Sequence, residues 1–185
     1  MTVSRPAVLV AALVAAAIGV GSAALGRAFV YAGVDSMIRS AVSPTLLQWP
    51  FGRSGAALFG MSFLGGFVVL VGMVVLTTWL GARSARPGGG FFAVLFSSWL
   101  GMVLGATVAG IFNAISLLAI TAGTIPAGQY FIGTVSYAPY GGLIYGWIVG
   151  LIAALVFRAT NAKTPYEATG PSGPPTSYGV SPFNS

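Results

Sequence analysis

The sequence contains no cysteine and no histidine, and its only acidic residues are Asp35 and Glu167. These absences exclude disulfides, thiolate nucleophiles, imidazole bases and the usual protein ligands of zinc and haem. Asp35 and Glu167 are far apart in the sequence, so a catalytic pair of carboxylates is not expected. We therefore expect a protein that is not an enzyme and that binds no metal and no cofactor.

Charge of either sign is also scarce. Charged residues make up 5% of the chain, against about 25% in a typical soluble domain. Between Arg86 and Arg158, 71 consecutive residues include no Asp, Glu, Lys, Arg or His. A soluble domain needs ionised side chains over its surface. This stretch therefore indicates an integral membrane protein that is embedded in the lipid bilayer and has lipid as a partner.

Arginine residues divide the remaining chain into apolar segments. A bilayer core of ~30 Å needs roughly 20 helical residues. We therefore predict an all-α bundle of four transmembrane helices within a membrane domain of residues 1–160, with spans at 6–25, 55–80, 91–112 and 140–157. Residues 161–185 are rich in Pro, Gly and Ser, a composition that predicts a disordered tail.

The basic residues suggest an orientation. Arg5, Arg83, Arg86 and Arg158 flank the ends of spans that would share one side, and cytoplasmic loops carry the excess of Lys and Arg. We expect both chain termini in the cytoplasm, although three further arginines fall in the segment 27–53, which this topology places outside. The preference for Arg over Lys and the abundance of Ala and Gly indicate a bacterial inner membrane.

The first span has a second interpretation. Its basic start, apolar core and small residues at Ser22 and Ala24 also suit a cleaved signal peptide. The apolar stretch is long for such a peptide and continues past the candidate cleavage site, so we favour a retained helix.

The segment after the first span contains a helical pattern. Asp35 and Arg39 are spaced as an i,i+4 pair on a polar face, and the opposite face has apolar residues at helical spacing: Val34, Met37, Ile38, Ala41 and Val42. This pattern predicts a short amphipathic outer helix that ends before Pro44.

Residues 114–140 combine glycine and proline with aromatic residues such as Tyr130 and Tyr137. Glycine and proline interrupt regular structure, and tyrosine is enriched at membrane boundaries. We therefore predict a long, charge-free outer loop that packs on the outer face of the membrane or is covered by another protein. Whether the loop re-enters the membrane stays open.

Small residues recur at every fourth position in the predicted spans. The third span contains Gly101 and Gly105, and the fourth contains Gly142, Gly146 and Gly150. Small residues allow helices in lipid to approach closely. We interpret these glycines as a helix-packing face or as a partner interface.

Asn113 is the most polar side chain within an apolar stretch, so it is a candidate polar contact. A helix end or an interhelical hydrogen bond would explain it without a function. A contact with a solute or a partner is the functional alternative.

No acidic or basic residue lies deep in a predicted span, which argues against ion-coupled transport. The basic residues lie at span ends rather than in one cluster, so nucleic acid is not an expected partner. The leading hypothesis is a non-enzymatic accessory, scaffold or assembly subunit that packs against other membrane proteins or itself. The alternative is a passive channel or small-solute facilitator that acts as an oligomer.

Overall fold

The computed structural model describes residues 5–33, 35, 47, 56–85, 89–120 and 127–161. Four α-helices account for most of them: α1 (Arg5–Tyr31), α3 (Ala56–Ser84), α4 (Phe91–Ile120) and α5 (Ala127–Asn161). Each is long and apolar enough to cross a membrane. The structure confirms the prediction of an all-helical fold with four apolar helices, and no strand occurs in the described ranges.

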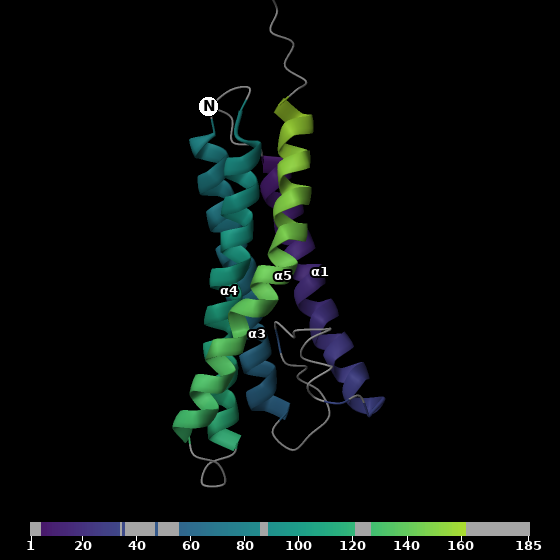
Figure 1. Ribbon diagram of the computed structural model, residues 1–185, viewed down its shortest axis with the longest axis vertical. Coiled ribbons are helices and arrows are strands. Elements are labelled where there is room, and N and C mark those ends of the chain that lie inside the picture. Colours follow the sequence, from purple (N-terminus) through teal and green to yellow (C-terminus); the bar gives the residue numbers. More distant parts are fainter. Residues whose placement is uncertain are drawn as a thin grey trace, which may run out of the picture.

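The helices alternate in direction and form a ring. The beginnings of α1 and α4 and the ends of α3 and α5 lie at one end of the bundle (Figure 1). Helix α4 contacts α3 and α5, and α1 contacts the same two helices. Gly90, just before α4, adopts a φ of 104°, a conformation that favours glycine. Its carbonyl oxygen accepts a hydrogen bond from the backbone N–H of Val94 at 2.9 Å.

The helices are longer than the predicted spans. The predicted long loop within residues 114–140 was wrong, because α4 continues to Ile120 and α5 already begins at Ala127. Gly128 and Pro139 both lie inside α5. Proline inside a helix removes one backbone hydrogen bond, yet apolar helices in packed bundles tolerate it. Glycine and proline were therefore poor indicators of a loop in this segment.

Two other predictions lie almost entirely outside the described residues. The segment 34–42 is described only at Asp35, which is not helical. The tail 162–185 is not described at all.

Small side chains face inward and large apolar side chains face outward. Ala7, Ala11, Ala15, Gly19 and Ala23 of α1 are buried at four-residue intervals. Among the described residues, the large apolar side chains that are fully buried are few: Leu70, Val74, Val94, Met102 and Val149, each 0% exposed. Many large apolar side chains point away from the bundle, including Leu13, Leu64 and Phe92. This pattern suits apolar surroundings better than water, because a water-exposed surface also carries many charged groups.

One residue between α1 and α3 packs into the bundle. Leu47 is 4% exposed, and its methyl groups lie against Gly19 of α1 and Gly66 of α3. Gly66 also contacts Ala109 of α4. Leu47 thus fills a space between α1 and α3 about halfway along α1, although the predicted topology places residues 27–53 outside the membrane.

Replacing Leu47 with Ala should remove this filling side chain and lower the stability of the bundle by about 2 kcal/mol, as other buried leucine-to-alanine changes do. Thermal unfolding in mild detergent measures the effect. Leu13→Ala is the matched control, because Leu13 is 69% exposed on α1 and its truncation leaves no cavity. Equal melting temperatures for the two variants would contradict the packing role of Leu47.

Candidate functional site

The glycines of α5 face α4 of the same chain. A Cβ atom at Gly142 would lie 2.6 Å from Met102 O and from Val103 Cα, and one at Gly150 would lie 2.5 Å from Leu95 O. Gly146 lies against the Trp99 side chain, at 2.7 Å for such a Cβ atom. All three positions therefore lie against the backbone of α4, because a Cβ atom at Gly146 would also lie 3.1 Å from Trp99 O.

The glycines of α4 face α3 in the same way. A Cβ atom at Gly101 would lie 2.9 Å from Val74 Cα, and one at Gly105 would lie 3.0 Å from Leu70 Cα. Helix α4 thus meets neighbouring backbone on two sides. The five glycines pack helices of one chain against each other, and α4 occupies the face of Gly142, Gly146 and Gly150 that a second copy would need.

A polar pair joins α3 to α4 inside the bundle. The hydroxyl groups of Thr78 and Ser98 are 2.8 Å apart, and both side chains are 0% exposed. Ser98 donates to Val94 O at 2.7 Å, so it accepts the hydroxyl hydrogen of Thr78. Other hydroxyl groups donate to carbonyls of their own helix, as is common in apolar helices: Thr77, Ser97, Thr107 and Ser116.

Asn113 differs from these residues. Its Oδ1 atom is buried and has no hydrogen-bond partner in the structure. Asn113 is not at a helix end, because α4 continues to Ile120. The explanation of Asn113 as a residue at a helix end was therefore wrong. Its buried carbonyl oxygen is an acceptor without a donor among the described residues.

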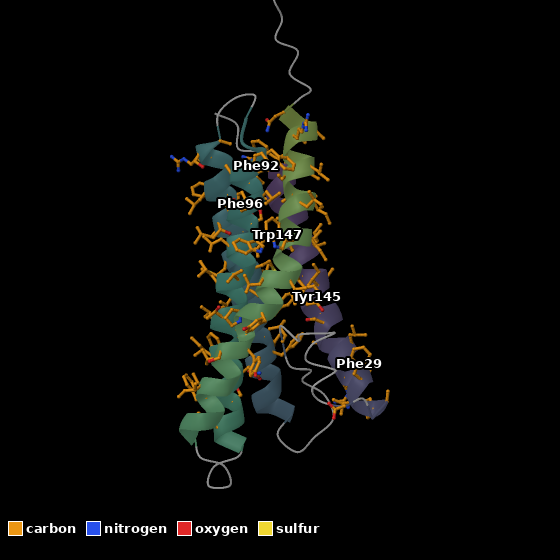
Figure 2. All side chains as sticks on the ribbon, in the orientation of Figure 1. Phe29, Phe92, Phe96, Tyr145 and Trp147 are labelled. Carbon is orange, nitrogen blue, oxygen red and sulfur yellow. The ribbon has the colours of Figure 1, made fainter. Side chains whose placement is uncertain are left out.

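An aromatic face covers one side of α4 and α5. Phe92, Phe96 and Trp147 follow one another along the bundle (Figure 2). Phe92 and Phe96 stack at 6.3 Å between ring centroids, and Phe96 meets Trp147 edge-on at 5.9 Å. Trp99 lies 5.4 Å from Trp147. We call Phe92, Phe96, Trp99 and Trp147 the aromatic face.

The two indole groups of the aromatic face differ. Trp99 Nε1 donates to Leu143 O at 3.2 Å and so ties α4 to α5. For Trp147, which is 48% exposed, no acceptor is found in the described part of the chain. Sequence reasoning missed this face, although positions 92, 96 and 99 lie on one side of a helix.

The described helices offer little chemistry beyond hydrogen bonding. Their charged residues lie near helix ends: Arg5, Arg27, Arg83 and Arg158. Within the described ranges, no group of three His, Cys, Asp or Glu residues could hold a metal ion.

No protein-family model, curated protein or solved structure matches the chain.

Replacing Gly142 with Ala should destabilise the bundle by about 1–3 kcal/mol, because the added methyl group meets the backbone of α4 and forces the helices apart. Thermal unfolding in detergent provides the measurement. Gly72→Ala is the control, since nothing lies within 4 Å of a Cβ atom there and Ala favours a helix over Gly. A Gly142 variant as stable as the Gly72 variant would refute close packing of α4 against α5.

Proposed function

We propose that the protein is a non-enzymatic, multi-pass subunit of a bacterial plasma membrane that packs against other membrane proteins as an accessory, scaffold or assembly factor. Four long apolar helices support the membrane location. Their inward-facing small residues and outward-facing large residues support lipid or other membrane proteins as the surroundings. The scarcity of ionisable groups favours binding over catalysis.

Trp147 carries the part of the proposal that concerns partners. It lies near the middle of the apolar span Val135–Asn161, half exposed, with its indole N–H unpaired among the described residues. Tryptophan prefers membrane boundaries, where its N–H finds water or headgroups. Acyl chains offer no acceptor, so a neighbouring transmembrane helix with a free carbonyl or hydroxyl would complete this site.

The aromatic face therefore replaces the glycine faces as the proposed partner surface. The glycines lie inside the chain, whereas Phe92, Phe96 and Trp147 are exposed. Aromatic side chains provide large contact areas at protein interfaces. The partner is either a different membrane protein or a second copy of this chain, and identification of the crosslinked product distinguishes these two.

No observation among the described residues supports the alternative function, a passive channel or small-solute facilitator that acts as an oligomer. Leu70, Val74, Met102 and Val149 fill the centre of the described bundle, so a path for solutes would have to run between copies. The proposed seam for such copies, the face of Gly142, Gly146 and Gly150, lies against α4.

Site-specific photo-crosslinking in intact cells tests the partner surface. A photoreactive residue at position 96 or 147 should give one discrete product with an integral membrane protein. The matched control is position 64 on α3, because Leu64 is also exposed, at 61%, and belongs to another face of the bundle. Equal products from all three positions, or none from 96 and 147, would remove the aromatic face from the proposal.

Single-cysteine labelling tests the topology, since the natural chain has no cysteine. Ala85→Cys and Ala159→Cys lie at the end of the bundle that carries both α1's beginning and α5's end. Both should resist a membrane-impermeant maleimide in intact cells and react after permeabilisation, whereas Gly33→Cys should react in both conditions. Labelling of all three variants in intact cells would contradict the proposed orientation.

A further inference from the structure

Two arginine residues lie over aromatic rings at opposite ends of the bundle. The Arg27 Cζ atom is 4.7 Å from the centroid of the Tyr31 ring, and the Arg83 Cζ atom is 5.3 Å from that of Trp79. Arg27 also donates a hydrogen bond to the Tyr31 hydroxyl. Arg83 has neither a hydrogen bond nor an ion pair with any described residue. The two sites thus share a geometry but differ in whether the guanidinium has an acceptor.

The end of the bundle that contains Arg83 also contains two other arginines. Arg5 opens α1, Arg83 lies in the last turn of α3 and Arg158 lies in the last turn of α5, so all three belong to the same end of the bundle (Figure 1). All three are exposed. The one acidic residue that the structure describes, Asp35, follows α1 at the opposite end. Positive charge at this end therefore has no carboxylate partner among the described residues.

The side chains next to Arg83 are apolar. Leu76, Trp79, Leu80 and Arg83 share one face of α3, because they are spaced three or four residues apart. Leu76 and Leu80 are each 49% exposed. Moving along this face toward the helix end, an exposed apolar surface is followed by an exposed guanidinium. This order matches an acyl chain followed by an anionic headgroup.

We propose that Trp79 and Arg83 bind the phosphate headgroup of an anionic phospholipid, with its acyl chain against Leu76 and Leu80. A guanidinium presents N–H groups in a fork that fits phosphate oxygens. The Trp79 ring holds the guanidinium by a cation–π contact. Arg5 and Arg158 add long-range attraction for the same leaflet. The proposal rests on the proposed membrane location and is independent of the partner surface.

A helix-end role for Arg83 makes a different prediction. A cation in the last turn of a helix stabilises the free carbonyls there. That contribution would be the same in zwitterionic and anionic lipid. Lipid dependence is therefore the readout that separates the two roles.

Native mass spectrometry of the full chain, released from nanodiscs of phosphatidylcholine with phosphatidylglycerol, tests the site. The wild-type protein should retain phosphatidylglycerol in preference to phosphatidylcholine. Arg83→Gln should lower this preference about tenfold, the equivalent of one charge-assisted hydrogen bond. Arg83→Lys should keep part of it, because the charge remains and the fork is lost. Arg27→Gln is the matched control and should leave the preference unchanged.

Three outcomes would overturn the proposal. The first is an equal loss for Arg83→Gln and Arg27→Gln, which would indicate attraction by net charge alone. The second is an unchanged lipid preference for Arg83→Gln together with lower thermal stability in both lipids, which would assign a helix-end role. The third is displacement of phosphatidylglycerol by millimolar inorganic phosphate, which would indicate a site for free phosphate. Circular dichroism confirms that each variant is folded, and recovery of the chain in a soluble fraction would instead contradict the membrane location.

Discussion

The close approach of α4 to the helices on either side is the constraint on which the rest of the bundle depends. Gly101 and Gly105 allow contact with the α3 backbone, and Gly142 and Gly150 allow contact with the α4 backbone. A glycine inside a helix costs about 1 kcal/mol relative to alanine. Where hydrophobic burial contributes little to helix association, dispersion between closely packed backbones must offset that cost.

This constraint explains where the large side chains lie. Backbones in close contact leave no room between them for leucine or phenylalanine, so most large apolar residues face away from the bundle. Packing around α1 is different, because side chains rather than backbone lie beside Gly19: a Cβ atom there would be 3.2 Å from the Leu70 side chain of α3 and 3.3 Å from the Leu47 side chain. Gly66 also lies against the Leu47 side chain, so both glycines make room for a side chain from the segment between α1 and α3.

The sequence predicts the number of helices because charged side chains are excluded from apolar spans, and the arginines consequently mark the span boundaries. It fails within residues 114–140 because both the helices and their connection lack charge, and Gly128 and Pro139 fall inside α5. The glycine spacing identifies packing positions but cannot tell a helix of the same chain from a partner. The contact between Phe96 and Trp147 joins two helices, so no spacing within one helix reveals it.

Under the proposed membrane location, the depth of each unpaired polar group determines what can satisfy it. Trp147 lies midway along α5, where acyl chains provide no acceptor, so its N–H requires a protein group. Arg83 lies at the end of α3, where a phosphate headgroup is within reach. Asn113 Oδ1 is the reverse case, a buried acceptor that requires a donor. Because Trp147 and Arg83 lie at different depths and Asn113 needs a donor rather than an acceptor, no single kind of group can satisfy all three.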